Sequence, residues 1–229
     1  MKLYTYFRSS AAYRVRIALH LKGLPYEAIP IHLVKGGGEQ KGAAYRAVNP
    51  NALLPAFETD ERAEGGQGGH NTLTQSLAII EYLDEVYPDV PLLPSTALGR
   101  ARSRELALLI ACDIHPVNNL RVLRYLTDTL KVDEAAKTAW YRHWVTEGLA
   151  ALEQHLARPA HNEGADAPAQ FCVGDAPTIA DCCLVPQVYN ARRFHVDMAA
   201  FPLIEAIDAR CAQLPAFQMA HPAQQPDAE

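Results

Sequence analysis

Two pairs of polar residues stand where helices are predicted to begin. Ser9 and Ser10 follow one short predicted strand, and Gln75 and Ser76 follow another. The first backbone N–H groups of a helix lack partners within the helix, and the helix dipole adds a partial positive charge there. Such a start can bind a carboxylate. The simpler interpretation, that these side chains only cap their helices, stays open on the residues alone.

Arginines supply the second kind of candidate chemistry. Arg8 precedes the serine pair, Arg121 lies in the second half of the chain, and Arg192 and Arg193 are adjacent in a predicted helix. The planar guanidinium group binds a carboxylate through two parallel hydrogen bonds, so these residues could bind small anions. The sequence does not choose between Arg192 and Arg193, and most surface arginines have no specific ligand.

His115 is a titratable candidate, because an imidazole changes charge near neutral pH. It precedes Pro116 at a predicted helix bend, and we treat it as a binding residue. With Cys112 it forms a C-x-x-H motif that is two ligands short of a zinc site. Neither C-x-x-C nor H-E-x-x-H occurs, so we expect no metal.

The composition is typical of a soluble globular protein. The chain has 229 residues, 49% hydrophobic and 21% charged, and a formal net charge of −5. An acidic chain is a poor general ligand for nucleic acid or anionic membranes. Five cysteines, an odd number, fit reduced thiols. No apolar run approaches the roughly 20 residues of a membrane span, and the first residues lack a signal-peptide cleavage site, so we expect a cytoplasmic protein.

Strand and helix signals alternate in the N-terminal part of the chain. Alternating apolar residues predict strands over residues 2–7, 26–31, 56–58 and 71–74. Apolar residues at helical spacing predict helices after Ser9 and from Ser76, with a short helix over 39–47. The order β-α-β-α-β-β-α predicts a small α/β domain over residues 1–87, with a glycine-rich loop at 65–69.

Only helical signals follow a proline-rich predicted linker over residues 88–97, so residues 98–229 are predicted to form an all-α domain. Thr178 begins a capping-box pattern. Residues 158–170 are predicted to form a mobile loop, and the tail after Pro222 is predicted to be disordered. Two apolar stripes are predicted to face the core: Trp140, Trp144, Gly148, Leu152 and Leu156, and Ile204, Ile207, Cys211 and Leu214.

This organisation resembles a cytosolic glutathione transferase over nearly the whole chain. The first domain is similar to thioredoxin, with Ser9-Ser10 where thioredoxins have C-x-x-C. Together, several motifs resemble the zeta class, which includes maleylacetoacetate and maleylpyruvate isomerases: Arg8-Ser9-Ser10 with residues 13–19, Val48-Asn49-Pro50, Leu54-Pro55, residues 75–83, and residues 113–116 with Asn118-Asn119. Ala11 and Tyr13 replace the class's cysteine and tryptophan, which argues against an essential protein thiol.

The resemblance implies a glutathione transferase fold with glutathione as the cofactor. Ser9, with Ser10 second, would donate its hydroxyl to the glutathione thiolate. An extended Leu54 before a cis Pro55 would pair with the cysteinyl part of glutathione. The thiol of bound glutathione would add reversibly to a cis double bond, and rotation followed by elimination would give the trans isomer.

The same resemblance implies the remaining roles. Gln75 and Ser76 would bind the γ-glutamyl end of glutathione, and His115 would lie near the mouth of the site. The substrate would be a maleyl β-diketo acid, a small dicarboxylate. By family analogy Arg8 and Arg193 would bind its two carboxylates, with Arg121 as a third candidate. The family also implies a homodimer.

Several functions stay open at this point. Maleylacetoacetate, a product of tyrosine breakdown, is the favoured substrate, and maleylpyruvate of gentisate breakdown is a close alternative. A detoxifying transferase would use the same thiolate with a more apolar pocket. A non-enzymatic binding module is a third possibility, and the set of Ser9, Leu54-Pro55 and Gln75-Ser76 argues against it.

Overall fold

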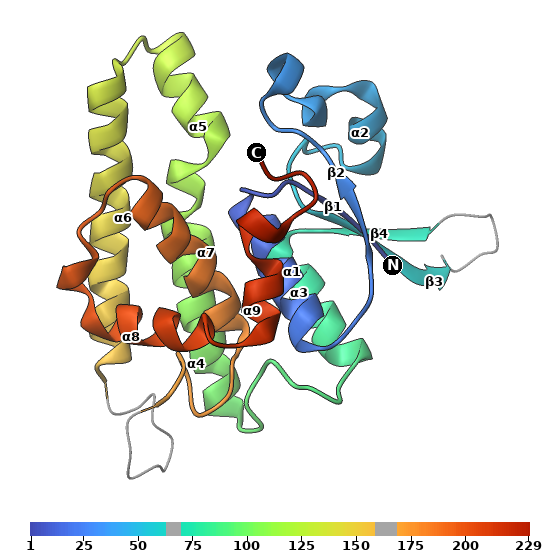
Figure 1. The fold of residues 1–229 in the computed structure, drawn as a ribbon, viewed down its shortest axis with the longest axis vertical. Coiled ribbons are helices and arrows are strands. Elements are labelled where there is room, and N and C mark those ends of the chain that lie inside the picture. The colour runs from blue at the N-terminus through green and yellow to red at the C-terminus, as the bar shows by residue number, and fades with distance from the viewer. Residues whose placement is uncertain (63–69, 159–168) are drawn as a thin grey trace. The chain divides into compact units, whose positions relative to one another are not determined.

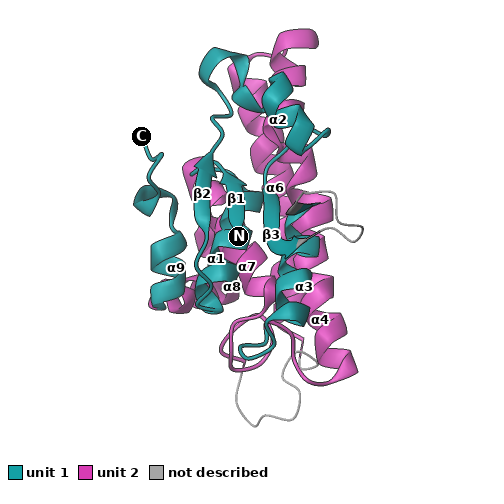
Figure 2. Ribbon diagram, turned by 90° about the vertical axis from the view of Figure 1, so that its right-hand side faces the viewer, with its two compact units in different colours: residues 1–91, 214–229 teal, residues 92–213 magenta. Residues whose placement is uncertain are grey.

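The computed structural model describes residues 1–62, 70–158 and 169–229. The chain forms two compact units, which we call the first unit (residues 1–91 and 214–229) and the second unit (residues 92–213) (Figure 2). The predicted glycine-rich loop at 65–69 and most of the predicted loop at 158–170 lie outside the described residues.

The first unit contains the predicted α/β arrangement (Figure 1). Two short 3-10 turns, η1 and η2, separate β2 from α2. The predicted order β-α-β-α-β-β-α is confirmed. The elements are β1 (Lys2–Thr5), α1 (Ser10–Leu21), β2 (Glu27–Pro30), η1 (Lys35–Gly37), η2 (Glu39–Lys41), α2 (Ala43–Val48), β3 (Ala56–Arg62), β4 (His70–Thr74) and α3 (Ser76–Val86).

The four strands form one mixed sheet in the order β2-β1-β3-β4. β1 is parallel to β2 and antiparallel to β3, and β3 is antiparallel to β4. The register aligns Tyr4 with Ala56 and Ala56 with Thr74. The segments that follow β1 and β4 therefore lie at the same end of the sheet as the segment that precedes β3.

The core of the first unit explains why these elements form. Leu3 and Phe57 are partners in the β1–β3 register, and both are fully buried. α1 and α3 pack against each other and bury further large side chains, each contributing about 1.5–3 kcal/mol. The fully buried members are Val15, Ile17, Leu19, Ile79, Ile80 and Leu83.

The C-terminal segment belongs to the first unit, which differs from the predicted domain boundaries. α9 (Pro215–Ala220) packs on α1, and η8 (Pro222–Gln224) follows it. Arg16, which is fully buried, donates a hydrogen bond from Nε to the Ala220 carbonyl at 3.1 Å. The prediction of disorder after Pro222 is wrong, because Pro222–Gln224 form η8 and the buried Phe7 N–H donates to Asp227 Oδ2.

The described part of the second unit is helical. It contains α4 (Ala97–Leu108), η3 (Leu109–Ile114), η4 (Pro116–Asn118), α5 (Leu120–Arg124), η5 (Tyr125–Thr129), α6 (Glu134–Leu156), α7 (Ile179–Arg193), η7 (Met198–Ala200) and α8 (Pro202–Cys211). The predicted capping box of Thr178 and Asp181 is confirmed. Within the helical stretch Ala97–Thr129, one 18-residue window is apolar enough to cross a membrane by length and composition alone, and 28% of this window is buried; a single such helix is weak evidence for a membrane span.

The predicted apolar stripe of α6 is confirmed at Leu152 but not at Trp144. Trp144 is 38% exposed, and Trp140 Nε1 donates to the Val117 carbonyl at 3.0 Å. The other buried residues of α6 are Tyr141, Val145 and Leu149, which lie outside the predicted stripe. Both stripes have helical spacing, so only packing could choose between them. In the second predicted stripe Ile204, Ile207 and Cys211 are buried, whereas Leu214 precedes α9 in the first unit.

We predict that Gly148→Ala lowers the free energy of unfolding. A Cβ atom at this position would lie 2.3 Å from Cγ1 of Ile114, which is 1% exposed, so side chains in the core would have to shift. The overpacking should cost about 1–3 kcal/mol, more than the helix propensity gained from alanine. Denaturant unfolding measures the change. The double variant with Ile114→Ala should lose less than the sum of the two single variants; full additivity would contradict the clash.

Candidate functional site

The segment between β1 and α1 is a β-turn that carries Arg8. The Ser9 N–H donates to the Tyr6 carbonyl at 2.9 Å, which leaves Phe7 and Arg8 as the central residues. Arg16 donates to the carbonyls of Tyr6 (3.3 Å) and Phe7 (2.9 Å). The buried guanidinium group of Arg16 therefore stabilises the turn by binding two of the turn's carbonyl groups.

Ser9 is the N-cap of α1, as its position in the sequence predicts. Its Oγ accepts a hydrogen bond from the Ala12 N–H at 3.3 Å. A hydroxyl that accepts through a lone pair keeps its own hydrogen for another partner. Capping and donation to a ligand are therefore compatible at Ser9. Ser10 is the first residue of α1 and is 9% exposed.

Arg8 has neutral neighbours. Its Nη2 donates to the Tyr6 hydroxyl at 3.0 Å, and its guanidinium carbon lies 4.7 Å from the centre of the Phe7 ring. Among residues 1–62, 70–158 and 169–229, no carboxylate pairs with it. An aromatic face orients a cation without neutralising it, so Arg8 keeps its charge for an anion.

The Leu54–Pro55 peptide bond is cis, as the family resemblance implies. In the described part of the chain, neither the N–H nor the C=O of Leu54 has a hydrogen-bond partner. The preceding carbonyl, that of Leu53, accepts from the Tyr45 hydroxyl and from Asn49 Nδ2, each at 2.7 Å. Asn49 is 1% exposed. The sequence interpretation gave Tyr45 and Asn49 no role, although an asparagine before a proline was the available signal.

α3 begins at Ser76, as the sequence predicts, but the Ser76 side chain does not cap it. Its N-cap is Gln75, with φ 70° and ψ 115°, and Ser76 is the first helical residue. A positive φ is uncommon outside glycine, and such backbone strain concentrates at functional sites. No side-chain hydrogen bond caps the first turn, so its N–H groups can bind an anion.

A buried arginine adds positive charge at the same helix start. Arg14 Nη1 donates to Ser76 Oγ at 3.2 Å, and the two residues are 3% and 5% exposed. Because the Ser76 oxygen accepts this bond, its hydroxyl hydrogen can serve a ligand. The sequence interpretation missed this role of Arg14, since the two residues are 62 positions apart and no local pattern links them.

Three segments at one end of the sheet therefore offer complementary groups. The start of α3 offers an anion site, Leu54 offers an unpaired peptide, and Ser9 offers a hydroxyl donor. Such a set fits an extended peptide that carries a carboxylate at one end and an ionisable group further along.

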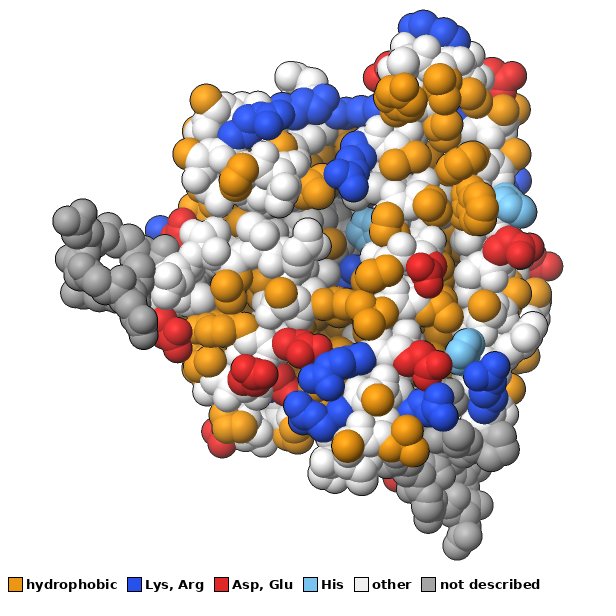
Figure 3. Space-filling view, turned by 180° about the vertical axis from the view of Figure 1, so that it is seen from behind, with side chains coloured by type: hydrophobic (Ala, Val, Ile, Leu, Met, Phe, Trp, Pro, Cys, Tyr) orange, Lys and Arg blue, Asp and Glu red, His pale blue; other side chains and the backbone are white. Residues whose placement is uncertain are grey.

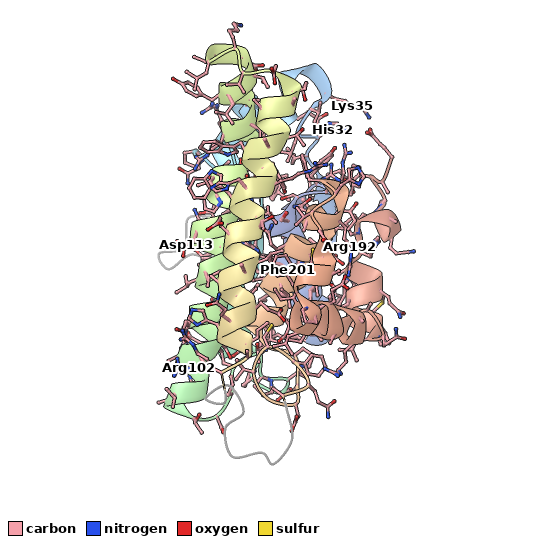
Figure 4. All side chains as sticks on the ribbon, turned by 90° about the vertical axis from the view of Figure 1, so that its left-hand side faces the viewer. His32, Lys35, Arg102, Asp113, Arg192 and Phe201 are labelled. Carbon is pink, nitrogen blue, oxygen red and sulfur yellow. The ribbon has the colours of Figure 1, made fainter. Side chains whose placement is uncertain are left out.

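Arg192 and Arg193, in the second unit, differ in their partners. Arg192, which is labelled in Figure 4, forms ion pairs with Asp208 at 2.5 Å and Glu205 at 3.4 Å. Arg193 Nη1 donates only to the neutral Asn190 Oδ1 at 3.0 Å, and no described carboxylate pairs with it. The choice that the sequence left open therefore favours Arg193 as an anion-binding residue.

The other candidates of the second unit are less constrained. His115 is half-buried, and its Nε2 lies 3.4 Å from Asn119 Nδ2. Arg121 is exposed, and its backbone N–H donates to Asn119 Oδ1 at 3.1 Å. The side chain of Arg121 forms no hydrogen bond or ion pair with any described residue, so nothing orients it.

The four buried cysteines and the acidic residues do not suggest a rival site; the fifth cysteine, Cys112, is exposed. Cys172, Cys182, Cys183 and Cys211 are buried free thiols, and burial raises the pKa of the Cys172 thiol well above its usual value. Such thiols are poor nucleophiles. Within the described residues, no group of three or more His, Cys, Asp or Glu side chains could hold a metal ion.

Comparison with known proteins identifies relatives along the whole chain. Residues 8–86 match the family model for the glutathione S-transferase N-terminal domain, and residues 145–223 match that for the C-terminal domain. A probable maleylacetoacetate isomerase of Vibrio cholerae is 49% identical over 226 residues, covering 99% of this chain and 97% of the relative.

Solved structures agree with these relatives. A holo maleyl pyruvate isomerase, described as a bacterial glutathione S-transferase of the zeta class, is 47% identical with a TM-score of 0.87 and full coverage of both chains. A maleylacetoacetate isomerase from Anaeromyxobacter dehalogenans 2CP-1, with glutathione bound in its active site, is 43% identical with a TM-score of 0.84; the match covers 100% of this chain and 97% of that one.

We predict that Tyr45→Phe makes stability less sensitive to alkaline pH. Burial raises the pKa of Tyr45 above its usual value of 10.0. Its contribution is therefore complete below about pH 10 and is lost as the pH rises toward the folded-state pKa. The variant should reduce the loss of unfolding free energy above pH 10 by up to about 1.4 kcal/mol per pH unit. Denaturant unfolding across this range tests it, with Tyr125→Phe, at an exposed position, as the control; equal slopes in all chains would contradict the prediction.

Proposed function

This chain belongs to the glutathione S-transferase family, and we propose that it catalyses glutathione-dependent cis–trans isomerisation of a maleyl β-diketo acid. The preferred substrate is maleylacetoacetate, which yields fumarylacetoacetate in tyrosine and phenylalanine breakdown. The observation that carries the proposal is that one end of the sheet offers groups suited to binding a peptide, and that the same unit carries Arg8, a cation that has no acidic partner among the described residues.

The residues at the sheet end fit glutathione. The first turn of α3, with Gln75 and Ser76, would bind the γ-glutamyl carboxylate, because its N–H groups lack a side-chain cap and Arg14 adds positive charge. The unpaired N–H and C=O of Leu54, before Pro55, would pair with the cysteinyl backbone. When bound, glutathione supplies a thiolate that can add reversibly to a polarised double bond.

The protein's own side chains would hold charge in place. The Ser9 hydroxyl would donate to the thiolate sulfur and lower the thiol pKa, with Ser10 as second donor. Arg8 and Arg193 would each bind one substrate carboxylate and stabilise negative charge that develops on the substrate. His115 and Arg121 are the remaining binding candidates. This division of roles requires no protein thiol, in agreement with Ala11 at the position of the class's cysteine.

The decisive experiment follows the alkene signals of maleylacetoacetate and of maleylpyruvate by NMR, with and without glutathione. Glutathione-dependent conversion of either substrate supports the isomerase, and the faster one names the substrate. Conversion that is undiminished without glutathione contradicts the proposal. Failure with both, together with stable conjugate formed from a generic electrophile, favours a detoxifying transferase. Failure to bind immobilised glutathione favours a binding module.

We predict that Arg193→Met raises KM for the dicarboxylate about tenfold to a hundredfold, because one charge-assisted bidentate contact is lost. Affinity for glutathione should stay unchanged. Steady-state kinetics and glutathione titration measure both quantities. Arg192→Met is the matched control: it removes ion pairs with Asp208 and Glu205 and should lower stability while leaving KM as it was. A larger KM effect in the control would reverse the assignment.

The chain is further proposed to act as a homodimer in the cytoplasm. Large apolar side chains are exposed along the helical stretch of the second unit, and Figure 3 shows hydrophobic side chains gathered on this face. Exposed apolar surface of this kind marks interaction sites. Sedimentation velocity at several protein concentrations tests the assembly. The exposed residues are Leu98, Leu108, Tyr125 and Leu130.

A further inference from the structure

The last residues of the chain reach the turn that carries Arg8 and Ser9. Asp227 Oδ2 accepts a hydrogen bond from the Phe7 N–H at 2.9 Å, although the two residues are 220 positions apart. Phe7 is 4% exposed. In the described part of the chain, its N–H has no acceptor other than Asp227.

This contact completes the set of bonds that fix the turn. Arg16 binds the carbonyls of Tyr6 and Phe7, and the Ser9 N–H closes the turn on the Tyr6 carbonyl. These bonds leave the Phe7 N–H unrestrained. Asp227 therefore binds the backbone N–H of Phe7, which is the one of the turn's two central residues that precedes Arg8.

Contacts on both sides of Asp227 hold the C-terminal segment in place. Gln225 is 8% exposed, and its Nε2 donates to the carbonyls of Met219 (2.9 Å) and His221 (3.1 Å). On the other side, Glu229 Oε1 lies 2.9 Å from Lys35 Nζ and 3.1 Å from His32 Nε2.

His32 links this segment to Arg8 by a second route. Its Nδ1 accepts the N–H groups of Val34 and Lys35, so Nε2 carries the hydrogen that a neutral ring donates to Glu229. The ring also packs edge-on against Tyr6, with centroids 4.9 Å apart, and the Tyr6 hydroxyl binds Arg8. Figure 4 shows His32 and Lys35 close together.

We propose that Asp227 is a positioning residue, which orients the Ser9 hydroxyl and the Arg8 guanidinium group through the Phe7 N–H. The inference rests on the proposed function, because it assigns Ser9 and Arg8 to bound glutathione and the substrate. Small displacements of groups that contact reacting atoms have large effects on rate. A carboxylate near a thiolate would by itself disfavour ionisation, so the role of Asp227 lies in its geometry rather than its charge.

The test is titration of the thiol of bound glutathione, followed by thiolate absorbance in the ultraviolet. Asp227→Ala should raise this thiol pKa by about one unit, which is about a tenfold loss of thiolate at a fixed lower pH. Asp227→Asn keeps an acceptor and loses the charge, so it should retain most of the parent value. Asp227→Glu keeps the charge and displaces the acceptor, so it should shift the pKa upward and serves if Asp227→Ala does not fold.

Asp133→Ala is the matched control. Asp133 Oδ1 accepts the Ala136 N–H at 2.7 Å at the start of α6, so this variant loses the same kind of bond in the second unit. It should lower stability without moving the thiol pKa. A parent-like thiol pKa in a folded Asp227→Ala would overturn the proposal, as would equal shifts in the Ala and Asn variants. Because the titration requires only glutathione binding, failure of isomerisation in the parent chain would refute the proposed substrate and leave this result readable.

Discussion

The buried guanidinium group of Arg16 is the interaction on which the candidate site depends. Arg16 is fully buried and binds Thr5 Oγ1 at 3.0 Å, in addition to the carbonyls of Tyr6, Phe7 and Ala220. A buried charge is tolerated only where several acceptors surround it. The acceptors that bind this guanidinium group come from the end of β1, the turn before α1 and the end of α9. Its hydrogen bonds therefore hold these three segments next to one another.

The site consists of backbone groups that secondary structure leaves without partners. β1, β3 and β4 satisfy one another within the sheet, and their registers place three chain exits at one end. There the peptide of Leu54 is unpaired, and Gln75 holds a left-handed conformation at an uncapped helix start. Unfavourable backbone conformations and unpaired backbone groups concentrate at functional sites, where a ligand can supply the missing hydrogen-bond partners.

The sequence alone does not distinguish the arginines that stabilise the fold from those that could bind a ligand, but their partners in the structure differ. Arg16 is surrounded by neutral oxygens and Arg192 by carboxylates, so both are committed to the fold. Arg8 and Arg193 contact only neutral groups and aromatic rings among the described residues. The distinction follows from which side chains each element packs against, and this information is absent from the local sequence.

The sequence by itself determined the local structure. Apolar periodicity, capping residues and prolines set the order of elements in the first unit, the helical character of the second and the N-cap role of Ser9, because each depends on residues a few positions apart. Tertiary structure alone decided the cap of α3, the buried face of α6 and the pairing of Arg192, but not of Arg193, with carboxylates. It also placed the C-terminal segment in the first unit, with Asp227 on Phe7. These features depend on groups separated by up to 220 positions, and no local preference encodes which buried donor finds which distant acceptor.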